Sequence, residues 1–223
     1  MASRGIVFIF SLLLILPAAG GCSRNFNNDP DAQVPSDARQ LNPRQPASPA
    51  DETPLETAPQ TGESVELPGI AYTLPDGWIP EAASGSFRVA QYRLPSDIEG
   101  QEAGEMVVFY FQGGGGGVQA NIDRWIGMFS MPDGSDPASA AQVGKAASNG
   151  IPLTTLDIAG TYNKSIGPPM AGNKQPFPGY RMLAAVAETQ AGPYFFRLTG
   201  PVATVGKWEE SFQQFLQNLR PNP

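Results

Sequence analysis

Met106-Val107-Val108-Phe109-Tyr110-Phe111 is a continuous run of apolar, β-prone residues, and a different period follows it. A short apolar run bounded by glycine is typical of a central strand that is buried on both faces. Gly113 to Gly117 end that run, and apolar residues then recur at the spacing of one helical face. Residues 118–129 are therefore predicted to form a helix, whose apolar stripe consists of Val118, Ile122, Trp125, Ile126 and Phe129.

Further strands are predicted on both sides of this unit from the alternation of apolar and polar residues and from turn signals. Asn149-Gly150 is a hairpin signal between an edge strand and its partner. An amphipathic pattern from Val202 to Leu219, with Pro201 close to its first turn, predicts the last helix. We expect an α+β fold, with a mostly antiparallel sheet covered by two main helices in a single domain over residues 67–223. The expected strands are residues 67–74, 87–94, 106–111, 142–148, 152–162, 180–189 and 194–199.

The N-terminus has the pattern of an export signal. Arg4 precedes an apolar run from Ile6 to Leu16, and small residues lead up to Cys22. This run is much shorter than the roughly 20 residues that a helix needs to cross a bilayer, so residues 1–21 are predicted to be a signal peptide. Ala19-Gly20-Gly21-Cys22 resembles the lipobox of bacterial lipoproteins, which implies that the Cys22 thiol carries the lipid. The alternative is an ordinary signal peptide that precedes a free thiol.

Residues 22–66 are predicted to be a disordered tether between the membrane and the domain. This segment is rich in Asn, Asp, Pro, Ser and Glu, and it has too few large apolar residues to offset its ordering entropy. Ser23 stands where Asp is the inner-membrane retention signal of the lipoproteins that this N-terminus resembles, which favours the outer membrane, facing the periplasm. The acidity of this segment argues against a nucleic-acid partner and against a polybasic membrane patch, because both need clustered Lys and Arg.

The chain contains no His, and its single Cys is assigned to the lipid. This composition excludes Ser-His-Asp and Cys-His catalysis, and it removes the usual ligands of zinc and copper. We therefore expect no metal, no cofactor and no catalytic residues. Carboxylate acid–base chemistry stays open as an alternative, although Glu209 and Glu210 are the only adjacent acids in the domain.

Two segments are candidates for binding. The five-glycine run lies between a strand and a helix, so the amides of Gly117, Val118 and Gln119 are a candidate weak anion site. The run lacks the Lys-Ser/Thr of a phosphate-binding loop, and a flexible turn is the alternative. Residues 165–179 are expected to be a long irregular loop, which is uncommon unless the loop is functional or disordered. The candidate partner-binding residues in or beside it are Lys164, Pro168, Pro169, Lys174 and Phe177.

The layout of the domain resembles a known family. Leu74-Pro75-Asp76-Gly77-Trp78, followed by strands, a helix, two hairpins and a terminal helix that ends near Leu219, is similar to the PsbP/Mog1 type of α/β/α sandwich. The stretches Arg124 to Gly127 and Gly192 to Pro201 also resemble an uncharacterised group of exported bacterial lipoproteins. The PsbP/Mog1 resemblance implies a non-catalytic module that binds a protein partner or helps an assembly to form.

These observations lead to a ranked expectation of function. The first is a membrane-anchored, non-catalytic lipoprotein that acts as a protein-binding or assembly module in the bacterial cell envelope. The alternative is a small-ligand carrier or envelope-stress sensor that uses the crevice between the sheet and the helix of residues 118–129. A carboxylate-based glycan hydrolase is the third.

Overall fold

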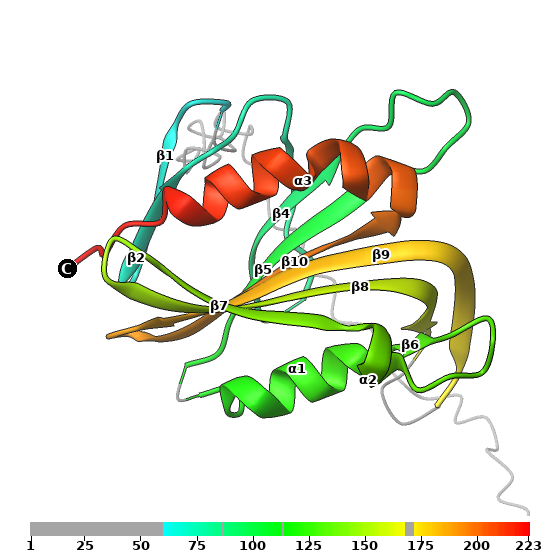
Figure 1. The fold of residues 1–223 in the computed structure, drawn as a ribbon. Coiled ribbons are helices and arrows are strands. Elements are labelled where there is room, and N and C mark those ends of the chain that lie inside the picture. The colour runs from blue at the N-terminus through cyan, green and yellow to red at the C-terminus, as the bar shows by residue number, and fades with distance from the viewer. Residues whose placement is uncertain (1–59, 86, 113, 168–171) are drawn as a thin grey trace, which may run out of the picture. The chain divides into compact units, whose positions relative to one another are not determined.

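A computed structural model describes residues 60–85, 87–112, 114–167 and 172–223. The predicted signal peptide, Cys22 and most of the predicted tether lie outside these residues. Helices cover both faces of one large antiparallel sheet, with α3 on one face and α1 on the other (Figure 1). The elements are β1 (Ser64–Leu67), β2 (Ile70–Thr73), β3 (Ile79–Glu81), β4 (Arg88–Leu94), β5 (Gly104–Tyr110), α1 (Val118–Ile126), β6 (Phe129–Ser130), α2 (Pro137–Ala140), β7 (Gln142–Ser148), β8 (Ile151–Ser165), β9 (Lys174–Thr189), β10 (Gly192–Pro201) and α3 (Val202–Gln217).

The large sheet has the strand order β3-β4-β5-β10-β9-β8-β6, and β7 pairs with β8 beside β6. Every pairing is antiparallel, and β5 lies inside the sheet between β4 and β10, as its continuous apolar sequence predicts. β1 and β2 form a separate two-stranded sheet. The α+β fold class, with two main helices on a mostly antiparallel sheet, is confirmed.

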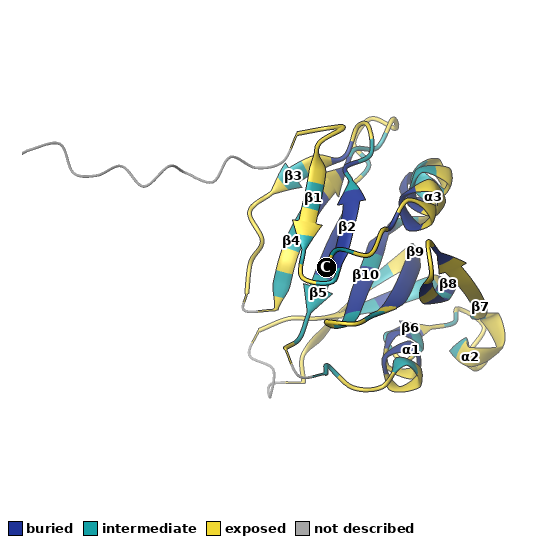
Figure 2. Cartoon of the chain, turned by 90° about the vertical axis from the view of Figure 1, so that its left-hand side faces the viewer, coloured by how far each residue is buried: buried dark blue, intermediate teal, exposed yellow. Residues whose placement is uncertain are grey.

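The alternation of side chains along the inner strands divides the core into two layers. On β9, Leu183 and Ala185 belong to the layer under α3, whereas Met182 and Ala184 belong to the layer over α1. Both faces are therefore buried from Met182 to Ala187 on β9 and over most of β10, while β1 and the outer sides of the helices are largely exposed (Figure 2). This arrangement explains why β9 is apolar at every position from Met182 to Ala187.

The turn Pro75-Asp76-Gly77-Trp78 fixes the start of the domain against α3. Gly77 has a φ of +78°, and a Cβ atom there would lie 2.7 Å from Cη2 of Trp208. Glycine satisfies both the left-handed backbone and the close approach of this ring. Trp78 is 1% exposed, and its Nε1 donates to Ser211 Oγ at 3.0 Å. The two tryptophans thus attach the turn to the last helix.

The predicted hairpin at Asn149-Gly150 is present, and a hairpin also joins the strands that were expected over residues 180–189 and 194–199. Asn149 and Gly150 connect β7 to β8 with φ values of +47° and +86°, the backbone that a type I′ turn requires. Gln190 and Ala191 connect β9 to β10. The edge strand at 142–148 is confirmed, because β7 pairs only with β8 among the described residues.

The prediction of an irregular loop over residues 165–179 was wrong. β8 continues to Ser165, and β9 begins at Lys174, opposite Ser165. Pro176 lies opposite Asn163 in this ladder. Ile166 N donates to the Asn173 carbonyl oxygen, so these two residues form a hydrogen-bonded pair. Such pairs alternate along an antiparallel ladder with pairs that are not hydrogen-bonded, and Pro176 belongs to the second kind. The nitrogen of residue 176 therefore points away from β8.

The second proline of this segment, Pro178, lies two residues after Pro176 on β9, so its nitrogen also points away from β8. β10 ends its pairing with β9 at Tyr180, so the other edge of β9 has no partner strand among the described residues at these positions. Proline is tolerated on such an edge, because its missing N–H costs no ladder bond. The two prolines, which suggested a loop in the sequence, instead mark a part of β9 that has one unpaired edge.

Two element boundaries also differ from the prediction. The strand expected over 67–74 is a hairpin, because Pro68 and Gly69 form a tight turn in which Gly69 has a φ of +78°. Its first strand begins at Ser64, before the predicted start at residue 67. The helix expected over 118–129 ends at Ile126, since Phe129 belongs to β6 and remains buried from that strand.

No helix within the described residues is both long enough and apolar enough to cross a membrane.

Candidate functional site

A cleft opens where the outer end of the β8–β9 hairpin faces the loop between β4 and β5. A register shift between Gly160 and Tyr162 bends this end of the hairpin. The cleft has a volume of about 390 Å³ and carries both charges and several aromatic rings. We call it the hairpin cleft, and its lining residues are Glu81, Arg93, Glu102, Ala103, Gly104, Glu105, Tyr162, Lys164, Phe177, Tyr180 and Thr199.

The three carboxylates of the hairpin cleft are engaged with donors inside the protein. Glu105 Oε1 accepts from Arg88 Nη1 at 2.9 Å, and Glu81 Oε1 lies 3.3 Å from Arg93 Nε. Glu102 Oε2 accepts from the Tyr180 hydroxyl, which ties the hairpin end to the loop after β4. The pKa of Tyr180 is raised, first by burial and then by this hydrogen bond. The acids therefore hold the walls of the cleft together.

Two buried polar atoms beside these carboxylates have no hydrogen-bond partner within the described residues. They are Thr199 Oγ1, which belongs to the cleft wall, and Arg197 Nε, two positions earlier on β10. Native proteins leave few buried polar groups unsatisfied, and those few require an explanation. Both atoms lie on the face of the sheet that α1 covers, because β10 alternates between the two core layers.

Arginines and an aromatic ring continue this surface away from the hairpin cleft. The guanidinium carbons of Arg88 and Arg197 lie 5.7 and 5.2 Å from the centroid of the Phe109 ring. Such distances allow cation–π attraction. Arg and aromatic residues are enriched at the centres of protein interfaces. The arrangement can therefore bind a polar segment with apolar neighbours, and it presents no group that is set up for covalent chemistry.

Within the described residues, no group of three or more His, Cys, Asp or Glu side chains is arranged to hold a metal ion.

The hairpin cleft unites two of the predicted partner-binding residues, Lys164 and Phe177. Lys174 lies at the start of β9, opposite Ser165, and does not line the cleft. Pro168 and Pro169 lie outside the described residues, as does the predicted lipid site Cys22. The role of all these residues stays a prediction.

The candidate anion site at the start of α1 also stays a prediction. Gly117 is the N-cap of α1, and no side chain caps the helix there. Val118 is the first helical residue, and the Gln119 side chain donates to Asp123 Oδ1 at 2.8 Å. Asn121 Nδ2 donates to the Gly117 carbonyl oxygen. These contacts organise the helix start without pointing to a ligand.

A second hollow, of about 570 Å³, lies between α3 and the turn after β2. Its buried polar atoms are satisfied within the protein: Trp78 Nε1 donates to Ser211 Oγ, and Trp208 Nε1 donates to the Pro95 carbonyl oxygen at 2.9 Å. Although it is larger, it therefore lacks the unpartnered groups that distinguish the hairpin cleft.

The crevice proposed for a small-ligand carrier is filled by the protein itself. Ile122 and Trp125 of α1 are 0% and 2% exposed and pack on the sheet. The Trp125 ring lies edge-on to Phe195, with centroids 6.3 Å apart. The interval between the helix of residues 118–129 and the sheet is thus core, and the carrier alternative loses the site that it was assigned.

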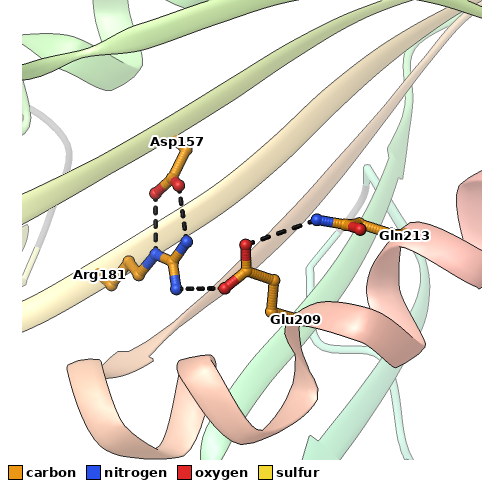
Figure 3. A network of polar contacts seen from close by, with 4 residues as sticks. All are labelled: Asp157, Arg181, Glu209 and Gln213. Atoms are coloured by element: carbon orange, nitrogen blue, oxygen red, sulfur yellow. Dashed lines mark hydrogen bonds and ion pairs between the residues drawn. The ribbon is translucent and has the colours of Figure 1, made fainter.

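The most extensive ion-pair network joins α3 to the sheet on the opposite face (Figure 3). Arg181 of β9 donates to both oxygens of Asp157, at 2.8 and 2.6 Å, and to Glu209 at 2.7 Å. Gln213 donates to the other Glu209 oxygen at 3.4 Å. These contacts raise the pKa of Arg181. Every charged group here has a partner, so we assign the network to stability.

Comparison with known proteins gave only distant structural likeness. No family model matches the chain, and no curated protein does. A Pseudomonas aeruginosa protein of unknown function described as a putative regulator is 14% identical over 72% of this chain and 96% of its own, with a TM-score of 0.42. Cyanobacterial PsbP from Synechocystis is 15% identical over 69% and 87%, with a TM-score of 0.39.

A third solved structure with a similar arrangement is LpqN of Mycobacterium tuberculosis, which is described as involved in cell envelope biogenesis. It is 14% identical over 72% of this chain and 90% of its own, with a TM-score of 0.40. The likeness to PsbP that the sequence led us to expect is thus found among solved structures. It concerns the arrangement of the sheet and helices.

Proposed function

We propose that the chain is a lipid-anchored, non-catalytic module of the bacterial cell envelope, which binds a partner protein through the hairpin cleft. The observation that supports this role is the cleft itself, where aromatic side chains, cations and an unpartnered buried hydroxyl meet at the bent end of β8 and β9. The chain has no His, and the cleft carboxylates are engaged by donors within the protein. The glycan-hydrolase alternative therefore has no free carboxylate pair in the hairpin cleft.

The anchoring half of the proposal rests on Cys22 and the lipobox-like residues before it. Expressed in a bacterium that has an outer membrane, the full chain should sediment with outer-membrane markers and incorporate a labelled fatty acid. Cys22→Ser should lose the label and move to the soluble periplasmic fraction. Without the Cys22 thiol the chain carries no acyl group that could be buried in the membrane. Ser23→Ala, which keeps the cysteine, is the matched control. Unchanged sedimentation of Cys22→Ser would contradict lipid anchoring.

The partner-binding half can be tested by site-specific photocrosslinking in living cells. A benzoylphenylalanine at position 177 places the reactive group in the hairpin cleft, because Phe177 lines it. We expect one discrete adduct with an envelope protein. Ile98 is 55% exposed and lies outside the cleft, so the same group at position 98 is the control and should not give that adduct. Identical adducts from both positions, or none from position 177, would refute the assignment of the partner surface to the cleft.

A further inference from the structure

The position of Arg197 is unusual for a charged residue. It lies on β10 between Phe195 and Thr199, on a strand whose neighbouring positions are buried, while Arg197 itself is partly exposed. Its Nε atom is enclosed and has no hydrogen-bond partner, and the Nη1 atom has only a weak contact with Met128 Sδ at 4.0 Å. No carboxylate forms an ion pair with Arg197 within the described part of the chain.

The enclosed Nε side of this guanidinium is expected to be unfavourable to the isolated fold. Burial removes water from it, which lowers its pKa, although an arginine stays charged at any ordinary pH. A buried charge without a partner is unfavourable, and an apolar side chain of similar length is often neutral or stabilising in its place. Folding alone therefore does not explain an arginine at position 197, whereas binding of an anion would.

The charges around Arg197 leave an excess of positive groups. Those that face it are the cations Arg88 and Arg124 and the acid Glu105, together with the Tyr162 hydroxyl. Glu105 is already bound to Arg88 at 2.9 Å, and Arg124 donates to Asn121 rather than to a carboxylate. This concentration of cations occurs in a chain whose net charge is −7.

We propose that Thr199, in the wall of the hairpin cleft, and Arg197, two positions away on the same face of β10, form an anion-binding position that receives a carboxylate side chain of the partner protein. The inference rests on the proposed partner-binding function and names the chemistry that the partner presents. Among the described residues, Thr199 Oγ1 and Arg197 Nε are the two enclosed side-chain donors that lack a hydrogen-bond partner. Phe109 lies beside the guanidinium and Phe177 lines the cleft, so apolar residues next to the bound carboxylate would contact aromatic rings.

The acids of the cleft favour a carboxylate over a phosphate. Glu81, Glu102 and Glu105 line the same cleft, and each adds repulsion toward a bound anion. A carboxylate carries one negative charge, whereas a phosphate group carries about 1.5 to 2 at neutral pH. A carboxylate can therefore bind one guanidinium and one hydroxyl with less repulsion from the three cleft glutamates than a phosphate would meet.

The test uses the full chain in detergent and a synthetic probe, the blocked peptide acetyl-Phe-Glu-Phe-amide. Its binding is followed through the Arg197 Nε–Hε resonance of ¹⁵N-labelled protein. We expect saturable movement of this resonance with the Glu peptide and none with acetyl-Phe-Gln-Phe-amide. Binding of both peptides with equal affinity, or a fixed Arg197 resonance, would overturn the assignment. Stronger competition by inorganic phosphate than by acetate would overturn the choice of carboxylate.

Two variants separate binding from folding. Arg197→Met should lower the affinity for the Glu peptide at least about tenfold, as measured from the amide resonances of β10. The Tm of this variant should equal or exceed that of the wild type. Thr199→Val should lower the affinity for the same peptide about threefold or more. Lys145→Met on β7 removes a positive charge outside the cleft and should leave the affinity unchanged. Undiminished affinity in Arg197→Met would refute the proposal.

The same variants distinguish this inference from the proposed function. If Arg197→Met retains the position-177 adduct and full peptide affinity, the anion position is wrong while the partner surface stands. If the wild-type chain forms no adduct from position 177 and binds neither peptide, both are wrong. A fall in the Tm of Arg197→Met would contradict the argument that the guanidinium is unfavourable to the fold.

Discussion

Phe215→Ala is expected to lower the free energy of unfolding by about 4 kcal/mol, the largest loss that we predict for a single substitution. Phe215 is 1% exposed on α3, and three aromatic rings from separate parts of the chain surround it. The centroids of Tyr72, Trp78 and Phe196 lie 5.0, 5.1 and 5.2 Å from its own. Truncation would leave a cavity where β2, the turn after it, β10 and the helix meet.

Urea denaturation of the full chain, followed by tryptophan fluorescence, measures this loss. Phe87→Ala is the matched control, because Phe87 is 55% exposed and contacts mainly Phe111. We expect the control to change the free energy of unfolding by less than about 1 kcal/mol. Equal losses in the two variants would show that the packing around Phe215 does not carry the stability that we assign to it.

Arg181→Ala is expected to cost about 2 to 3 kcal/mol. Removing the guanidinium leaves Asp157 and Glu209 without their shared cation, and breaking a buried pair costs more than the pair contributed. The Arg181 side chain is 16% exposed, whereas those of Asp157 and Glu209 are 29% and 37% exposed, so water offsets part of the loss. The midpoint of urea unfolding should fall with little change in the slope.

The control for this prediction is an arginine with one solvent-exposed partner. Arg93 is 47% exposed and pairs with Glu81 at 3.3 Å, so Arg93→Ala should cost less than about 1 kcal/mol. A loss of the same size in both variants would mean that the bidentate contact and the link to α3 add nothing beyond an ordinary surface ion pair.

The fold class followed from local patterns in the sequence. The change of period after Phe111, the Asn149-Gly150 turn and the stripe from Val202 onward identify elements whose signals lie within a few residues. Residues 165–179 were misread because Pro176 and Pro178 indicate a loop by composition. A proline interrupts a ladder only if its nitrogen faces a paired edge of the strand. At these two positions the facing edge of β9 is unpaired because β10 stops pairing at Tyr180, and the local sequence does not show this.

The candidate site was predictable only in part. Lys164 and Phe177 were found because they border an unusual segment, yet most of the hairpin cleft comes from strands far away in sequence. Arg197 did carry a local signal, since a single charge interrupts the apolar stretch Tyr194-Phe195-Phe196-Arg197-Leu198. Its lack of a partner depends on three-dimensional neighbours such as Arg88, and one sequence does not contain that information.

The hairpin of β1 and β2 has a mechanical consequence for a tethered domain. Ala71 exchanges two backbone hydrogen bonds of 2.8 Å with Arg220, which joins the start of the domain to its C-terminal end. Under the proposed anchoring, a force on the tether enters at Gln60 and pulls first on the outermost bonds, which are Gly62 N to Leu74 O and Leu74 N to Glu63 O. β1 would then unzip one bond at a time, and extend the chain, while β2 stays held by its buried side chains and by Arg220. If the domain is anchored as proposed, this hairpin would open before the tension reached the large sheet and the hairpin cleft.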